Sequence, residues 1–167
     1  MIYGRPFPED PIDQVDIVDS RPLFWPAFWD LDRAPAMVAN EVRHRVIVVS
    51  QTCDLANQKS DWATIAVLLD AQKVVDEKEM KAADIKGLVR AGRVFGWYFL
   101  PKSEEHGLPE MIVDLRQLHT VRIDMLRAMC LRGLRSARLQ PPYREHLNQH
   151  FANSYARIGL PEPYPTD

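Results

Sequence analysis

The chain of 167 residues has few of the features that mark a specialised class of protein. It contains only two cysteines, Cys53 and Cys130, which exclude a disulfide framework and suit a reducing compartment. No apolar run approaches the roughly 20 residues of a membrane span. Residues 1–6 also lack the apolar core of a secretion signal. We therefore expect a cytoplasmic protein with no membrane partner.

The chain also has few glycines and a small net charge. Seven glycines are scattered along the chain, so no glycine-rich phosphate loop is present, and we expect no cofactor and no bound metal. The formal net charge of −2 argues against nucleic-acid binding through bulk charge alone. Acidic residues dominate residues 1–20, however, and arginines dominate residues 116–157. Such asymmetry is typical either of a solvated helix surface or of a basic face for an anion.

The strongest positive signal is a strand that leads into a polar turn. Residues 46–49 are all β-branched, the composition of a strand covered on both faces. Residues 50–54 then supply two hydroxyls, an amide, a thiol and a carboxylate. Because proteins commonly carry reactive groups on loops held by rigid elements, this turn is a candidate functional site.

Hydrophobic periodicity and turn residues predict the remaining elements. Strands are expected over residues 23–29, 42–50, 62–69, 94–100, 111–115 and 119–123. Helices are expected over residues 70–90, 125–139 and 143–158. Residues 1–20 are expected to form an extended lead-in, and residues 159–167 a proline-rich tail. The strands 42–50 and 62–69 should pair antiparallel.

These elements predict a single domain over residues 1–167, in the α+β class. Short strands with few long helical crossovers favour a small curled antiparallel sheet or a barrel. One inserted helix and two C-terminal helices should accompany that sheet.

The order of elements resembles the MazF/PemK family, the SH3-like barrels of bacterial toxin–antitoxin systems. That family has an Arg-Arg-Pro turn before a strand ending in Val-Ser, and residues 43–50 are similar, with His44 and Arg45 at the Arg-Pro pair. Residues 65–70 lie where the family has its next strand, and residues 114–124 are similar to its Asp-Gln-Ile-Arg-Thr-Val-Asp segment. The resemblance covers about residues 20–130 in element order. It implies an SH3-like barrel that binds RNA, with an antitoxin as a protein partner and a homodimer as its assembly.

The resemblance further implies RNA cleavage without a metal, through attack by an internal 2′-hydroxyl. That reaction needs a base and a group that stabilises the phosphorane. The candidate catalytic residues are Arg43, Arg45, Thr52, Cys53, Asp54 and His119. The candidate nucleic-acid contacts are Arg43, His44 and Arg45, together with Arg127, Arg135 and Arg138 on one arc of the expected helix 125–139.

Two functions from other classes stay open. A non-catalytic protein-interaction module would use exposed aromatic side chains, for which the candidates are Phe24, Trp25, Phe28, Trp29, Trp97 and Tyr98. A thiol enzyme would use Cys53 as its nucleophile. The structural alternatives are that Cys53 is a small buried residue and that Asp54 and Asn57 simply build the turn.

Overall fold

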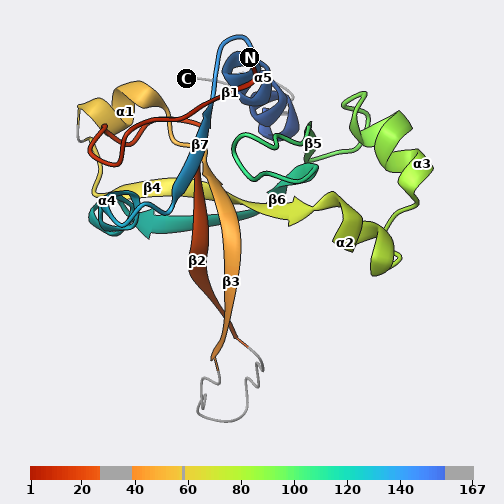
Figure 1. The fold of residues 1–167 in the computed structure, drawn as a ribbon, viewed down its shortest axis with the longest axis horizontal. Coiled ribbons are helices and arrows are strands. Elements are labelled where there is room, and N and C mark those ends of the chain that lie inside the picture. Colours follow the sequence, from red (N-terminus) through yellow and green to blue (C-terminus); the bar gives the residue numbers. More distant parts are fainter. Residues whose placement is uncertain (27–38, 58, 157–167) are drawn as a thin grey trace, which may run out of the picture.

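The computed structural model describes residues 1–26, 39–57 and 59–156, with the backbone alone described at residues 20, 22–26 and 39–42. The strands are β1 (Tyr3–Gly4), β2 (Asp16–Pro26), β3 (Ala39–Val48), β4 (Trp62–Asp70), β5 (Trp97–Leu100), β6 (Met111–Arg122) and β7 (Arg135–Leu139). The helices are α1 (Thr52–Ala56), α2 (Ala71–Asp76), α3 (Ala82–Asp84), the π-helix η1 (Ile85–Val89), α4 (Ile123–Leu131) and α5 (Tyr143–Tyr155). Within the described residues, seven strands form one curled antiparallel sheet with helices around it, an α+β fold (Figure 1).

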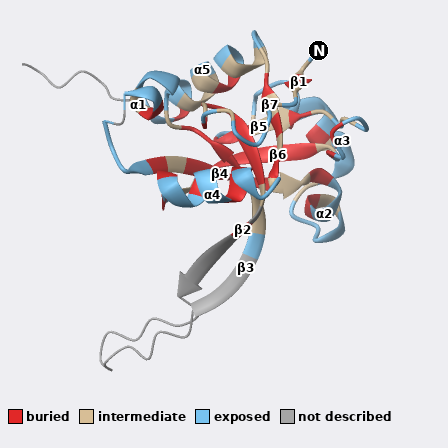
Figure 2. Cartoon of the chain, turned by 60° about the vertical axis from the view of Figure 1, so that its left-hand side comes forward, coloured by how far each residue is buried: buried red, intermediate tan, exposed pale blue. Residues whose placement is uncertain are grey.

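β3 occupies the middle of the sheet, whose strand order is β1-β7-β2-β3-β4-β6-β5. Ile47 and Val49 belong to one hydrophobic cluster, whereas Val46 and Val48 belong to another, and all four side chains are buried. Because neighbouring side chains of a strand point to opposite faces, both faces of β3 are covered. The predicted buried strand and its antiparallel pairing with β4 are therefore confirmed. Figure 2 shows the buried residues concentrated in these central strands.

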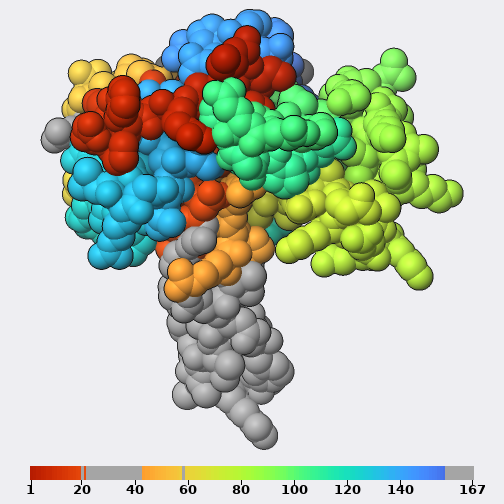
Figure 3. Space-filling model, viewed as in Figure 1, coloured from red at the N-terminus to blue at the C-terminus, as the bar shows by residue number. Residues whose placement is uncertain are grey.

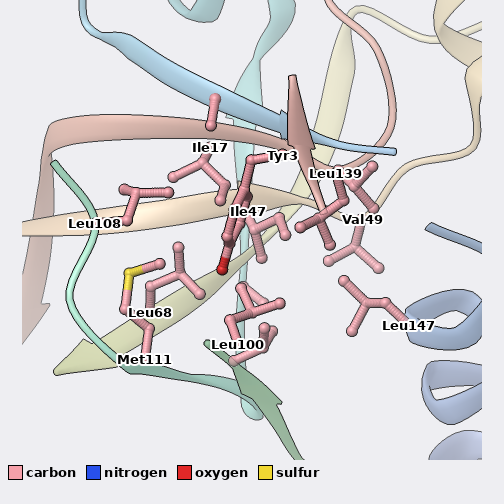
Figure 4. Packing of buried hydrophobic residues seen from close by; sticks show 14 of the residues in the cluster. Tyr3, Ile17, Ile47, Val49, Leu68, Leu100, Leu108, Met111, Leu139 and Leu147 are labelled. Carbon is pink, nitrogen blue, oxygen red and sulfur yellow. The ribbon is translucent and has the colours of Figure 1, made fainter. Parts of the chain in front are cut away.

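The curl of the sheet brings its two outermost strands together. Tyr3 of β1 packs in the same cluster as Leu100 of β5, together with Ile47 and Leu139 (Figure 4). The Tyr3 hydroxyl donates a 2.6 Å hydrogen bond to the carbonyl of Pro101, directly after β5. Because β1 and β5 are the two ends of the strand order, these contacts close the sheet into a half-barrel. The predicted curled antiparallel sheet is confirmed.

β2 and β3 extend beyond this body as a two-stranded ribbon. β3 pairs with β2 from residue 39 onward, but it pairs with β4 only over residues 45–48. In Figure 1 the ribbon crosses β4 and β6 and leaves the rest of the molecule. Residues 43–45 consequently lie where the ribbon emerges from the sheet.

The N-terminal segment is more structured than the expected extended lead-in. It contains β1 and the start of β2, and Arg135 of β7 holds the chain between them. The Arg135 guanidinium lies 3.0 Å from Asp16 Oδ2 and donates to the carbonyls of Phe7, Pro11 and Asp10. These partners are more than a hundred residues apart in the chain, so a local sequence pattern could not show them.

The predicted helix 125–139 is wrong in its second half. α4 ends at Leu131, and Gly133 adopts a left-handed backbone with φ of 76°. The Gly133 and Leu134 amides donate to the carbonyls of Cys130 and Met129, which is how a glycine commonly closes a helix. The chain then reverses, and residues 135–139 form β7 against β2.

The predicted helix 70–90 is also wrong, because the segment breaks into α2, α3 and η1. The Asp70 carboxylate accepts from the Gln72 and Lys73 amides and begins α2. Lys78 then adopts a positive φ of 61°, which a helix cannot continue through. The expected last helix is confirmed over the described residues as α5.

The two strands expected at 111–115 and 119–123 are one strand, β6. The link between them is a bulge, where the register with β4 shifts between Ala66 and Val67. Buried Asp114 organises this bulge, because its carboxylate accepts from Arg116 Nε at 2.9 Å and from Gln117 Nε2 at 2.9 Å. Burial alone would raise the pKa of Asp114, but these hydrogen bonds overcome it and hold the pKa below its ordinary value.

Candidate anion-binding site

Arg43, His44 and Arg45 line one pocket at the base of the β2–β3 ribbon. The pocket has a volume of about 440 Å³, and α2 contributes Lys73 to its opposite wall. Figure 3 shows the surface of β3 at this point beside the surface of α2. Strand alternation would place Arg43 and Arg45 on one face and His44 on the other. All three reach the pocket because it lies where β3 passes beyond its pairing with β4.

The three side chains differ in their surroundings. Arg43 is exposed, and His44 is half-buried. Arg45 Nε forms an ion pair with Asp19 of β2, and Arg45 Nη1 lies 3.5 Å from Met111 Sδ. Burial lowers the pKa of His44, and the positive charge of Lys73 lowers it further. A neutral imidazole is therefore held among cationic groups.

His119 of β6 is electrostatically linked to the same group. Burial is the largest cause of the lowered pKa of His119, and electrostatic interactions with His44 and Arg21 lower it further. Arg21 of β2 is the cross-strand partner of His44. Three strands thus bring Arg21, His44 and His119 within reach of one another's charge. Sequence reasoning proposed the two histidines but missed Arg21 and Lys73, since only strand pairing and the position of α2 bring them here.

The α2 side of the pocket is acidic. Asp70, Glu77 and Glu79 line it together with Lys73. The Asp70 carboxylate accepts hydrogen bonds from the amides at the start of α2. The hydrogen bond with Asp114 is the main cause of the raised pKa of Arg116, and the negative charge of Glu79 raises it further. An anion in this pocket would accordingly be held on the β3 side, where the guanidinium groups lie.

The structure places Thr52, Cys53 and Asp54 away from this pocket, on α1 beyond the other end of β3. The expected catalytic residues therefore fall into two separate groups. Cys53 is exposed rather than buried. Its Sγ lies 3.6 Å from Gln51 Oε1 and 3.7 Å from Asp54 Oδ1.

The polar turn at α1 has structural roles for two of its side chains. Asn57 Nδ2 donates to the Cys53 carbonyl at 2.7 Å, so the turn-building role of Asn57 is confirmed. Asp54 instead pairs with Lys59 at 2.7 Å, and this hydrogen bond lowers the pKa of Asp54. The thiol of Cys53 is thus accessible to solvent, but the neighbouring carboxylate of Asp54 already forms an ion pair with Lys59.

The predicted arginine face does not exist as one helical surface. Arg127 is exposed on α4, whereas Arg135 and Arg138 belong to β7. Arg135 is buried against Asp16, and Arg138 Nε donates to the same carboxylate at 2.6 Å. The expectation failed because a buried acid elsewhere in the chain attracts both arginines. A phosphate would have to displace these contacts.

The aromatic residues expected at a protein interface are largely elsewhere. Trp97 is buried in the core, and the Arg116 guanidinium stacks over its ring at 4.6 Å. Tyr98 is half-buried beside His150. The other four candidates, Phe24, Trp25, Phe28 and Trp29, have side chains outside the described residues.

Comparisons with known proteins give no assignment. The sequence matches no model of a known protein family, and no curated protein matches it. Over the part of the chain that the structure describes, no helix combines the length and the apolar character that crossing a membrane requires. In the same residues, no three potential metal-ligating side chains of the His, Cys, Asp or Glu type come together. The pocket at the base of the ribbon is therefore the basis for a functional proposal.

Proposed function

We propose that this protein is an RNA-binding, MazF/PemK-like domain that cleaves RNA without a metal. The observation that carries the proposal is the pocket in which Arg43, His44 and Arg45 meet Lys73, with His119 coupled to His44. The curled half-barrel suits the resemblance, which also implies an antitoxin partner and a homodimer.

Binding would rest on the basic side of the pocket. Arginine presents a planar fork that matches two phosphate oxygens, and lysine adds a compact positive charge. Arg43 is exposed at the rim and can meet the backbone of a strand first. Arg45 is already oriented by Asp19, so it offers a guanidinium held in place by a strand partner.

Cleavage would use the two imidazoles as base and acid. A neutral imidazole takes the proton of the 2′-hydroxyl, whose oxygen attacks the adjacent phosphorus. The bond from phosphorus to the 5′-oxygen breaks, and the second, protonated imidazole gives its proton to that oxygen. The products are a 2′,3′-cyclic phosphate and a 5′-hydroxyl. Arg43 and Arg45, which line the pocket beside His44, can stabilise the charge on the phosphorane.

The lowered pKa values of His44 and His119 are consistent with one imidazole acting as the base and the other as the acid. His44 and His119 both have pKa values below their ordinary range, so at neutral pH the base form is available. A phosphate bound nearby raises the pKa of the closer imidazole, because an anion favours the charged form. That imidazole can then serve as the acid.

The decisive experiment measures cleavage of end-labelled single-stranded RNA in the presence of a metal chelator. We expect cyclic-phosphate products from the parent protein and a loss of cleavage of about 100-fold or more in His44→Gln or His119→Gln, as for removal of a general acid or base. RNA binding should survive in both variants. Arg127→Ala serves as the control, because Arg127 is an exposed arginine on another element.

Three results would overturn parts of the proposal. Absence of RNA affinity at low salt would exclude the whole of it. Binding without cleavage would leave an RNA-binding domain and exclude the enzyme. Cleavage that survives in both histidine variants but is lost in Cys53→Ser would move the chemistry to α1.

A further inference from the structure

A second cavity of about 440 Å³ lies beside α2. Gln72 and Val75 face this cavity, whereas Lys73, Val74 and Glu77 face the anion-binding pocket. At 100° per residue these two sets occupy opposite sides of the helix. The second cavity is therefore a separate site, bounded by α2, α3, η1 and the chain before β6.

The cavity exists because the segment 71–91 does not run as one helix. After α2 the chain passes through Lys78 in a left-handed conformation, which non-glycine residues adopt only where the surrounding structure imposes it. It then returns as α3 and widens into the π-helical turn η1, a feature frequent at functional sites. Figure 3 shows this part of the chain as a lobe beside the body of the molecule.

The walls of the cavity are mainly apolar. Val75 of α2, Ile85 of η1 and Leu108 line it, together with Ala71, Ala82 and Pro109. Ile85 is itself anchored, because it is buried in the cluster that contains Trp97 and Val89. The apolar walls are thus held by the core rather than by exposed side chains.

Two lysines and two carboxylates line the cavity, so its formal charge is zero, but both carboxylates already have partners. Five polar residues line it: Asp70, Gln72, Lys86, Lys102 and Glu110. Asp70 is occupied by the amides at the start of α2, and Glu110 lies 3.8 Å from Arg90. Lys102 pairs at 3.1 Å with Glu104, but both side chains are largely exposed, and such pairs exchange at little cost.

We propose that this cavity binds a small amphipathic anion, with a carboxylate head between Lys86 and Lys102 and an apolar chain against Val75, Ile85 and Leu108. The volume lies within the range of small-molecule sites. The ammonium groups of Lys86 and Lys102 bind the carboxylate head, and the apolar walls bind the chain. The two cavities share Asp70 and Pro109. This site does not depend on RNA binding, since the residues proposed to bind its ligand line the second cavity and not the anion-binding pocket.

The test titrates the full-length protein with sodium octanoate and follows backbone amide shifts by NMR. We expect shifts confined to residues 70–75, 82–89 and 102–110. Octanol and octylamine, which share the chain but lack the negative charge, should bind at least about tenfold more weakly, because a hydrogen bond to a charged group is lost.

Two variants test separately the contacts of the carboxylate head and of the apolar chain of octanoate. Lys86→Gln with Lys102→Gln should weaken octanoate binding about tenfold, whereas exposed Lys81→Gln, which does not line the cavity, should leave it unchanged. Ala82→Trp should fill the cavity and abolish octanoate binding. The NMR spectrum of this variant should still be that of a folded protein. Equal binding of octanol and octanoate, or full binding by Ala82→Trp, would overturn the proposal, as would shifts outside these residues. RNA binding, measured in parallel, should be unaffected by any of these changes.

Discussion

Arg135 Nη1 lies 3.0 Å from Asp16 Oδ2, and neither side chain is more than 1% exposed. The same carboxylate accepts from Arg138, so one buried acid of β2 joins two arginines of β7. The guanidinium of Arg135 also donates hydrogen bonds to backbone carbonyls of the N-terminal segment. Two arginines that look like an exposed cationic face in the sequence therefore bind a buried acid instead, Arg135 from the interior and Arg138 from a partly buried position.

Breaking this ion pair should destabilise the fold. In Asp16→Asn the Arg135 charge remains buried without its carboxylate, which typically costs about 3–5 kcal/mol. The free energy of unfolding, measured by urea denaturation, should fall by that order. Asp124→Asn is the matched control, because Asp124 pairs with Arg122 at the exposed surface. The control should barely change the urea midpoint of unfolding. Equal effects of the two substitutions would contradict the claim that the Asp16–Arg135 pair is buried.

The two thiols should react at very different rates. Cys53 is exposed on α1, whereas Cys130 is 1% exposed against the sheet, and burial raises the pKa of Cys130. A chromophoric thiol reagent should label a single thiol in the native protein and a second only after denaturation. Cys53→Ser should remove the fast reaction, and Cys130→Ser should leave it. Rapid labelling of both thiols would show that the face of α4 that carries Cys130 is not packed against the sheet.

Stability should decrease as the pH falls below about 6.5. The pKa values of His44 and His119 are lowered from that ordinary value in the folded protein, so the folded state binds fewer protons than the unfolded state. The contribution of these histidines to the free energy of unfolding is fully present above about pH 6.5. It decreases as the pH falls toward the pKa values of the folded state and changes no further below them. His44→Gln with His119→Gln should flatten the profile in this window. An unchanged slope of unfolding free energy against pH would show that other groups titrate there.

RNA affinity should depend on salt through Arg43 and Lys73. Each lost phosphate contact reduces the log–log salt slope for a single strand by about 0.7. Arg43→Ala with Lys73→Ala should therefore flatten the salt dependence by roughly twice that amount. Stability should change little, because Arg43 is an exposed side chain. If only Arg127→Ala lowers the slope, the RNA contacts lie on α4 instead.

Element identity was predictable wherever local periodicity and burial agree. The β-branched residues 46–49 indicate a strand buried on both faces, and Val46 to Val49 occupy both faces of β3. Boundaries failed at single residues whose backbone conformation is set by the tertiary structure. Gly133 ends α4, and Lys78 breaks the helix expected over 70–90. Neither residue interrupts the hydrophobic pattern, so periodicity alone extends both helices too far.

The candidate site was predictable only in part. Arg43, His44 and Arg45 are adjacent in the chain, and their cationic cluster is visible without a fold. Arg21 and Lys73 join them through strand pairing and the position of α2, which no local pattern reveals. Thr52 and Cys53 were candidates for the same catalytic set as the arginines, but they lie on α1, with the buried residues 46–49 between the two groups.

The sequence by itself determined the α+β class, the central strand and the positive charges before it, because strand propensity and charge are properties of neighbouring residues. Only the tertiary structure decided which charges stay at the surface. Arg135 and Arg43 are chemically the same side chain, yet one is buried beside Asp16 and the other is exposed at the rim of a pocket. The fold places Arg135 in the interior, where the Asp16 carboxylate balances its charge, whereas it leaves Arg43 exposed to water. Contacts between residues far apart in the chain depend on how the sheet curls.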